Sequence, residues 1–231
     1  MSQIVSDWLD YAHSAVSPTD HFEACRTSTG GASTAGLEPD LRWPGYLGSG
    51  YEESPFRLLF LGQIHYPEEL ARTLGSFQQD MRTWASQPRT PSLDQRFLGS
   101  LQAAYRKAIP QWGPWKRTFS KLANRQRLAI EQIAYGNVAK CWLTVKRESN
   151  PNTTKPMRAC MPAFSPRDLV RRVRAQAAVV LCGRTFPLED LGIPHVTLIM
   201  RHSNPDLEEA HRVLTMIRRG QIIHGRIAIG R

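Results

Sequence analysis

The sequence predicts a three-layer α/β/α fold with a central four-stranded parallel sheet. Three observations predict it: four short apolar runs recur from residue 57 onward, segments of helix length separate them, and polar clusters follow three of the runs. Strands of a parallel sheet are covered on both faces and therefore read as continuous apolar runs. Because the carboxyl ends of such strands meet at one edge of the sheet, we expect a functional site at that edge.

The predicted elements follow an N-terminal helix that contains Trp8 and Leu9. Gly, Ser, Thr and Pro crowd residues 27–55, which indicates irregular structure. The predicted strands cover 57–61, 129–134 with Asn137 at the end, 177–183 and 196–200, and the predicted helices cover 68–82, 93–109, 166–175 and 206–218. A turn is predicted at 112–115, where the sequence reads Trp-Gly-Pro-Trp. We expect a single domain in which residues 1–55 pack on an α/β core formed by residues 56–231.

The chain is strongly basic. Its 231 residues include 30 Lys and Arg against 20 Asp and Glu, a formal net charge of +10. Such a balance favours a polyanionic partner, and we expect DNA, because cationic side chains release counterions from phosphates. No apolar stretch approaches the roughly 20 residues of a spanning helix, and no basic head followed by an apolar segment opens the chain. We therefore expect no membrane partner and a cytoplasmic monomer, associated with the nucleoid if the source is bacterial.

Five short motifs occur in a fixed order near the predicted elements. They are Gly62-Gln63-Ile64-His65-Tyr66, Phe77 thirteen residues after Ile64, Pro91-Ser92-Leu93, Asn137, and His202-Ser203-Asn204-Pro205. Together they resemble the motifs of the uracil-DNA glycosylase superfamily, over most of the chain from about residue 56. The resemblance implies a DNA glycosylase that flips a uracil or modified pyrimidine out of DNA and hydrolyses its N-glycosidic bond, leaving an abasic site. Repair and defence against modified bacteriophage DNA are both open as its biological role.

The resemblance implies a pocket for the extruded base. Phe77 corresponds to the aromatic residue that stacks on the base, and Asn137 to the amide that reads the Watson–Crick edge. Tyr66 corresponds to a wall of the pocket, and Ile64 replaces a carboxylate that the main family carries there. An altered residue at this position is consistent with an altered base.

Catalysis is expected to rest on neighbouring polar groups. His202 corresponds to the donor that stabilises negative charge as it develops on the leaving base. Ile64 cannot orient a water molecule, so one of His65, Glu68 and Glu69 is expected to supply the missing polar function, and Gln63 is a further expected catalytic residue. Members of the superfamily that lack this carboxylate rely on the histidine, so its absence does not exclude catalysis.

DNA contacts are expected from the loop that contains Ser92, which resembles the family's phosphate-binding loop. The other expected DNA-binding residues are Lys140, Arg201 and Ser203, with Arg171, Arg172, Arg174, Arg212, Arg218 and Arg219 as further candidates for backbone contacts. Leu207 fits either an apolar wedge that fills the gap left by the flipped base or a buried helix residue. The arginines at 171–174, in the predicted helix over 166–175, also fit a helix face exposed to solvent.

The cysteines resemble part of the superfamily's iron–sulfur branch. Cys141 and Cys160 match two cysteine positions of that branch, and Cys25 stands where it has a Cys-x-x-Cys pair, without the second cysteine. Four thiolates usually hold such a cluster, so a fourth ligand is needed, with His21 as the candidate. The alternative is that these are small buried residues. The hydrolysis itself requires no cofactor.

Each motif also has a structural explanation. Gln63 fits a residue that caps a turn, Phe77 a core residue of an amphipathic helix, and His202 a surface histidine. At the level of function, the alternative is a catalytically silent protein that binds DNA through the same fold. A complete set of pocket residues favours the enzyme. A nucleotide-binding enzyme fits less well, because the chain has neither a Gly-x-Gly-x-x-Gly fingerprint nor a phosphate-binding Gly-Lys-Ser/Thr loop.

Overall fold

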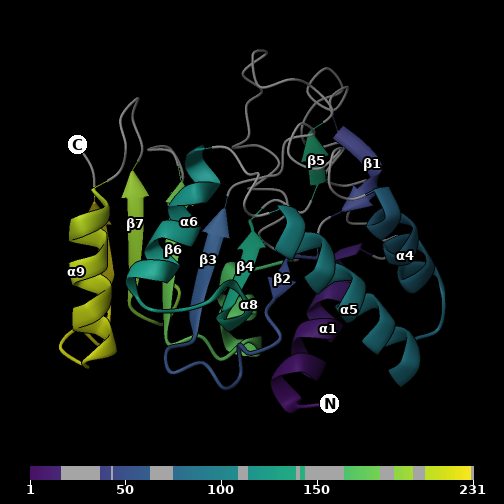
Figure 1. The fold of residues 1–231 in the computed structure, drawn as a ribbon, viewed down its shortest axis with the longest axis horizontal. Coiled ribbons are helices and arrows are strands. Elements are labelled where there is room, and N and C mark those ends of the chain that lie inside the picture. The colour runs from purple at the N-terminus through teal and green to yellow at the C-terminus, as the bar shows by residue number, and fades with distance from the viewer. Residues whose placement is uncertain are drawn as a thin grey trace.

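A six-stranded, mostly parallel sheet organises a mixed α/β fold (Figure 1). The computed structural model describes residues 1–16, 37–42, 44–62, 75–108, 114–138, 141–143, 164–182, 190–199 and 206–229. The sheet order is β2-β4-β3-β6-β7-β8. Its strands are β2 (Tyr46–Leu47), β3 (Leu58–Gly62), β4 (Ile133–Asn137), β6 (Ala177–Cys182), β7 (His195–Ile199) and β8 (Arg226–Ile229).

The four predicted strands correspond to β3, β4, β6 and β7, and they run parallel as expected. The predicted number of four strands is wrong, because β2 adds an antiparallel edge beside β4 and β8 adds a parallel edge beside β7. β2 is too short to show a pattern, and β8 alternates between exposed and buried positions. Residues 27–55 are also not irregular throughout, since β1 (Leu37–Arg42) pairs with β5 (Cys141–Leu143) in a separate two-stranded sheet.

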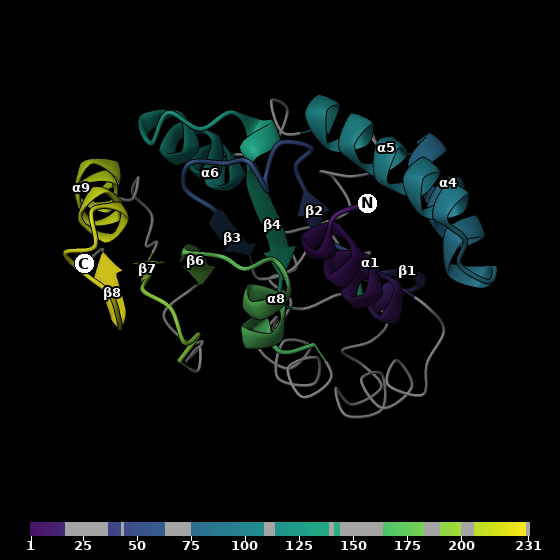
Figure 2. The ribbon, with the colours of Figure 1, turned by 90° about the horizontal axis from the view of Figure 1, so that it is seen from below.

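Helices lie on both sides of the main sheet. Helices α6 (Pro114–Arg125) and α9 (Leu207–Arg218) cover one face, and α1 (Gln3–Val16) and α8 (Pro166–Arg172) lie on the other (Figure 2). Helices α4 (Gly75–Ser86) and α5 (Pro91–Ala108) pack against each other beside the β2 edge. The sequence did not predict α6. Pro114, assigned to a turn, is its first residue, a position that proline favours because its missing N–H is not needed there.

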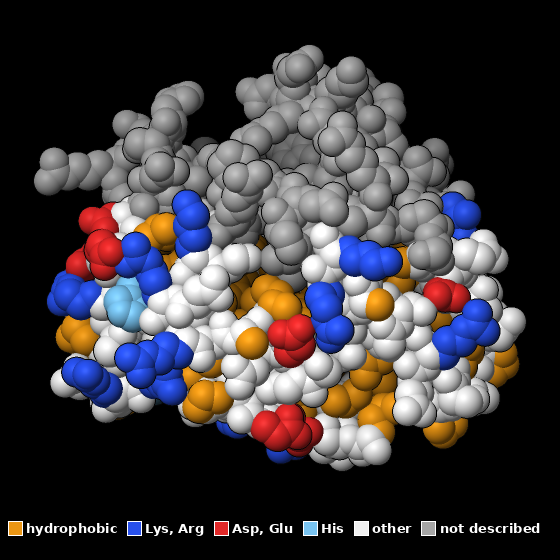
Figure 3. Space-filling view, in the orientation of Figure 1, with side chains coloured by type: hydrophobic (Ala, Val, Ile, Leu, Met, Phe, Trp, Pro, Cys, Tyr) orange, Lys and Arg blue, Asp and Glu red, His pale blue; other side chains and the backbone are white. Residues whose placement is uncertain are grey.

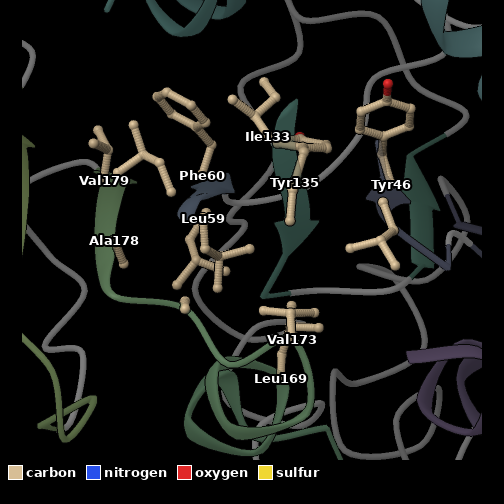
Figure 4. Packing of buried hydrophobic residues seen from close by; sticks show 14 of the residues in the cluster. Tyr46, Leu59, Phe60, Ile133, Tyr135, Leu169, Val173, Ala178 and Val179 are labelled. Carbon is tan, nitrogen blue, oxygen red and sulfur yellow. The ribbon is translucent and has the colours of Figure 1, made fainter. Parts of the chain in front are cut away.

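Alternation along the central strands builds a core on each face. Phe60 of β3 projects toward α6, where its ring lies 4.6 Å from that of Phe119. The preceding residue, Leu59, projects to the other side, toward Leu169 and Val173 at α8 (Figure 4). All five side chains are buried, and burying one side chain of this size contributes about 1.5–3 kcal/mol. The strand ends are therefore held in a fixed register by packing from both sides.

The N-terminal helix belongs to the same core. Trp8 and Leu9 are fully buried, and α1 contacts both α8 and α4. The guanidinium of Arg172 on α8 donates a hydrogen bond to the carbonyl of Asp7 (3.2 Å), and Arg89 forms an ion pair with Asp10. Within the described ranges, no helix is both long and apolar enough to cross a membrane.

Candidate active site at the carboxyl edge of the sheet

The carboxyl ends of the parallel strands meet at one edge, as the sequence predicted. Gly62 at the end of β3 lies opposite Asn137 at the end of β4, and the N–H of Val138 donates to the Gly62 carbonyl (3.0 Å). On the other side of β3, Cys182 ends β6 opposite Ile199, the last residue of β7. The first motif and the asparagine motif, 75 residues apart in sequence, are therefore adjacent in space.

The order of the strands places a topological switch point between β3 and β6 at this edge. From β3 the chain passes to β4 on one side, whereas from β6, the neighbour of β3 on the other side, it passes away to β7. Connections that leave adjacent strands in opposite directions open a crevice at their carboxyl ends, which is where ligands of doubly wound folds bind. Gly62 and Cys182 are the terminal residues of these two strands.

Asn137 is held in one orientation by its own strand. Its side chain is buried, and its Oδ1 accepts a hydrogen bond from the hydroxyl of Tyr135, which is also buried. The Tyr135 ring packs 5.3 Å from Phe119 and 6.2 Å from Tyr105, so the hydroxyl is itself fixed. Because Oδ1 faces Tyr135, the amide Nδ2 with its two donor hydrogens faces the other way. The sequence analysis singled out Asn137 but did not identify Tyr135 as its partner.

Gly62 is required for this close arrangement. A Cβ atom at position 62 would lie 2.8 Å from the Tyr135 hydroxyl oxygen and closer still to Oδ1 of Asn137. Neither neighbour is free to withdraw, since both are part of the buried hydrogen bond. Gly62 of the first motif therefore leaves the space that the side chain of Asn137 on the next strand occupies. The spacing of the motifs in the sequence does not reveal this relationship.

Phe77 lies in the core of the described structure. It is 2% exposed on α4, with its ring 5.8 Å from that of Phe97 on α5. This is the packing expected of a residue on the apolar face of a helix. Its proposed stacking on an extruded base stays a prediction.

Ser92 is not brought to the strand ends. It is exposed in the first turn of α5, where its Oγ lies 3.2 Å from Oγ1 of Thr90. The other end of α5 approaches the sheet, with Tyr105 stacked on Tyr46 at 4.6 Å. Thirteen helical residues separate Ser92 from Tyr105, a distance of about 20 Å along the axis. The structure therefore gives no support to a phosphate contact from Ser92 beside the pocket.

The remaining predicted pocket residues lie outside the described part of the chain. These are Gln63, Ile64, His65, Tyr66, Lys140, Arg201, His202 and Ser203. Each lies within four residues after the end of β3, β4 or β7 in the sequence. Their roles stay predictions.

Several of the basic residues named as candidates for DNA backbone contacts lie away from the candidate site. Arg171 lies in the last turn of α8 and Arg174 just beyond it, before the amino end of β6. Arg218 and Arg219 lie at the end of α9, before β8. Both pairs are at the edge opposite the candidate site. Arg172 and Arg212 form ion pairs with Asp168 and Glu209. Leu207 is half-buried against the core, which agrees with its interpretation as a helix residue.

The predicted metal ligands are only partly described. Cys141 is the first residue of β5, where it pairs with Arg42, and Cys25, Cys160 and His21 lie outside the described residues. Among the residues that are described, no three His, Cys, Asp or Glu side chains are grouped to hold a metal ion. A cluster therefore stays a prediction.

The sequence was compared with protein-family models and with curated proteins. No protein-family model matches the chain, and no curated protein matches it in sequence. The functional argument rests on the motifs and on the geometry of the strand ends.

Proposed function

We propose that this protein is a DNA glycosylase that extrudes a uracil or a modified pyrimidine from DNA and hydrolyses its N-glycosidic bond. The observation that carries the proposal is the oriented Asn137 amide beside Gly62 at the carboxyl ends of the strands, next to the switch in strand order. In this proposal the fold is a three-layer α/β/α arrangement around the central parallel strands, and the protein acts on DNA as a monomer. The excess of basic residues supports a DNA partner.

Asn137 supplies base recognition in this proposal. An extruded base loses its Watson–Crick partner, so the pocket must replace those hydrogen bonds. Tyr135 holds Oδ1 of this amide, and in the proposal its Nδ2 group donates to a carbonyl oxygen of the extruded base. An amide whose orientation is fixed before binding needs no reorganisation when the base arrives.

The reaction divides between the polar groups that follow the strands. As the bond between C1′ and the base nitrogen breaks, its electron pair passes to the base, and a water oxygen bonds to C1′ and gives up its proton to solvent or base. His202 donates a hydrogen bond to the base oxygen on which that charge gathers. Gln63 and His65 orient the water in place of the carboxylate absent at Ile64.

The decisive experiment measures base release from a panel of DNAs. The panel holds single strands and duplexes that contain uracil, together with viral DNA whose pyrimidines are modified, and abasic sites are scored by strand cleavage. We expect release from at least one member, and we expect His202→Ala to reduce it by about 100-fold with DNA affinity retained, since such donors act mainly in the transition state. His224→Ala, at an exposed histidine near the opposite edge, is the matched control and retains full activity.

The panel also separates the competing explanations. Release only from modified DNA assigns the protein to defence, and release from uracil assigns it to repair. Tight DNA binding without release from any substrate overturns the enzyme and supports the catalytically silent protein. Ile64→Asp, which restores the family's carboxylate, tests the first motif: uracil release by this variant but not by the parent locates the change of specificity at that position.

A further inference from the structure

Six arginines gather at the amino edge of the sheet, opposite the candidate active site. This amino-edge arginine cluster consists of Arg57, Arg127, Arg171, Arg174, Arg218 and Arg219. Arg57 precedes β3, and the others stand at or just beyond the ends of α6, α8 and α9, which all run back toward this edge. Arg57 is half-buried and the other five are exposed. Figure 3 shows basic side chains at the lower end of the α9 region, whereas acidic and basic side chains lie together at its upper end.

Direct contacts join the cluster into one surface. The Nε of Arg57 donates to the carbonyl of Arg174 (2.9 Å), whose own N–H donates to the carbonyl of Arg171 (3.1 Å). On the other side of β3, the guanidinium of Arg218 lies 5.8 Å from the centre of the Phe56 ring, adjacent in sequence to Arg57.

Arg218 also links the surface to α6. Its Nη1 donates to the carbonyl of Gln126, adjacent to Arg127 (3.0 Å). The charges therefore lie on neighbouring elements along the amino edge, where the ends of helices from both faces of the sheet meet.

None of the six arginines forms an ion pair within the described part of the chain. The arginines that do pair with carboxylates are Arg89, Arg96, Arg106, Arg125, Arg172 and Arg212. Glu52 and Glu53 lie on the exposed turn before Phe56, yet neither pairs with the cluster. No direct ion pair therefore compensates the charges of these six side chains among the described residues, and their mutual repulsion disfavours the compact state.

Two of the arginines occupy backbone positions that suit glycine. Arg127 and Arg174 have φ angles of 58° and 49°, in the left-handed region that side chains with a Cβ rarely adopt. Each follows the end of a helix, where glycine is the usual residue. The same edge does use glycine at two other such positions, Gly220 and Gly225. A side chain kept in a strained conformation is a sign of function when a simpler residue fits better.

We propose that the amino-edge arginine cluster is a second nucleic-acid surface, which binds the phosphate backbone without reading sequence. Every member is arginine, whose planar fork bonds a phosphate through two N–H groups. All six members carry charge, whereas protein interfaces bury an apolar centre, and the exposed apolar side chain at this edge is Ile223, in the loop between α9 and β8. A five-residue strand spans about 17 Å, so this edge contacts a different stretch of nucleic acid from the one held at the opposite edge. The surface is independent of the proposed glycosylase activity.

Binding of single-stranded and duplex oligonucleotides of 30 nucleotides, followed by fluorescence anisotropy over a range of salt concentrations, tests the proposal. The variant combines Arg127→Gly, Arg171→Gln, Arg174→Gly and Arg219→Gln. We expect its affinity at 100 mM salt to fall at least ten-fold, and the slope of log affinity against log salt to become shallower by up to about 3.6, or 0.9 for each lost phosphate contact. The matched control replaces four arginines that form ion pairs, Arg96, Arg106, Arg125 and Arg212, by glutamine and so has the same net charge.

A second variant separates binding from folding. Arg127→Gly with Arg174→Gly relieves the backbone at both positions, so we expect an unchanged or higher melting temperature together with weaker binding of DNA. A rise in melting temperature with no loss of binding overturns the proposal. So does equal weakening in the charge-matched control, or binding of vesicles rich in anionic lipid as tight as binding of DNA. Base release at saturating DNA is expected to be unchanged in both variants, which keeps this test apart from that of the glycosylase.

Discussion

The hydroxyl of Tyr135 donates a hydrogen bond to Oδ1 of Asn137, two residues further along β4. Residues two apart on a strand project from the same face, so the pair is built into the strand and needs no other element to bring it together. Both side chains are buried, where a hydrogen bond between them is stronger than it would be in water. In this pair Oδ1 is the end of the Asn137 amide that faces Tyr135, and Nδ2 faces away.

Tyr135→Phe tests this relationship. The variant leaves a buried acceptor without its donor, so we expect the free energy of unfolding to fall by about 1–3 kcal/mol. We also expect slower base release and weaker discrimination between bases, because the amide is free to turn. Tyr46→Phe, which also removes a hydroxyl bonded to a carbonyl, that of Ile130, is the control and should lower stability without changing selectivity. Equal selectivity in the two variants would contradict a positioning role for Tyr135.

Gly62→Ala tests the close approach of β3 and β4. The new methyl group would overlap Oδ1 of Asn137 and the hydroxyl of Tyr135, so the buried bond must break or the strands must separate. We expect a loss of roughly 1–3 kcal/mol of stability, as for other overpacked sites, and loss of base release. Gly99→Ala is the matched control: nothing lies within 4 Å of its Cβ on α5, so this change should stabilise the helix by about 0.5–1 kcal/mol. A fully stable, active Gly62→Ala protein would disprove the argument. Chemical denaturation measures the change in stability of both variants.

The strands that the sequence predicted were those whose burial is continuous. Every residue from Leu58 to Gly62 in β3 is buried, and so is every residue of β4, which gives an apolar run that no helix or loop explains better. Convergence of Gly62 and Asn137 followed from the parallel arrangement alone. The topology was therefore accessible because each central strand carries its own signal.

The elements that escaped prediction depend on partners distant in sequence. Tyr46 and Leu47 form a strand because Tyr135 and Ala134 pair with them, and two residues show no period. The role of Tyr135 required knowing which atom its hydroxyl faces. Pro114 was read as part of a turn although it opens a helix, a case in which one residue type serves both structures.

Asp94→Asn tests the junction of α1, α4 and α5. Asp94 is buried and accepts hydrogen bonds from Trp84 Nε1 (2.8 Å) and from Arg89 Nε and Nη2 (3.0 and 2.9 Å), while Arg89 also pairs with Asp10. Burial on its own raises the pKa of Asp94, but hydrogen bonds from Arg89 and then Trp84 outweigh it and leave the pKa below 3.8.

The sign of the pH effect follows from that lowered pKa. The stabilisation is fully present above the unfolded-state pKa near 3.8 and is lost as the pH falls through the lower folded-state value. We expect Asp94→Asn to lower stability by about 1.5–3 kcal/mol at pH 7 and to remove this acid-dependent loss. Urea denaturation between pH 7 and 3 measures the free energy of unfolding of the parent and of this variant. Asp80→Asn breaks the pair with the exposed Arg96 and should change stability by no more than about 1 kcal/mol. Equal losses of stability in Asp94→Asn and Asp80→Asn would show that the burial of Asp94 does not matter.

His195 gives the protein a second pH dependence, nearer neutrality. Its ring is buried at the start of β7, with Nδ1 3.1 Å from the carbonyl of Ile193 and no hydrogen-bond partner for Nε2 in the structure as described. Burial lowers the pKa of His195 below 6.5, and the charge of Arg226 lowers it further, against the opposing effect of the Ile193 carbonyl.

Because the unfolded chain takes up a proton near pH 6.5 and the folded protein does not, stability is full above that pH and is lost as the pH falls toward the folded-state pKa. We expect the free energy of unfolding to fall by at most about 1.4 kcal/mol per pH unit in this window. His195→Phe keeps the ring volume without the titrating group and should flatten the profile between pH 7.5 and 5, whereas His224→Gln, at an exposed position, should leave it unchanged. An NMR titration of the His195 ring gives an independent check: a midpoint at or above 6.5 would contradict the explanation even if the variant folds poorly.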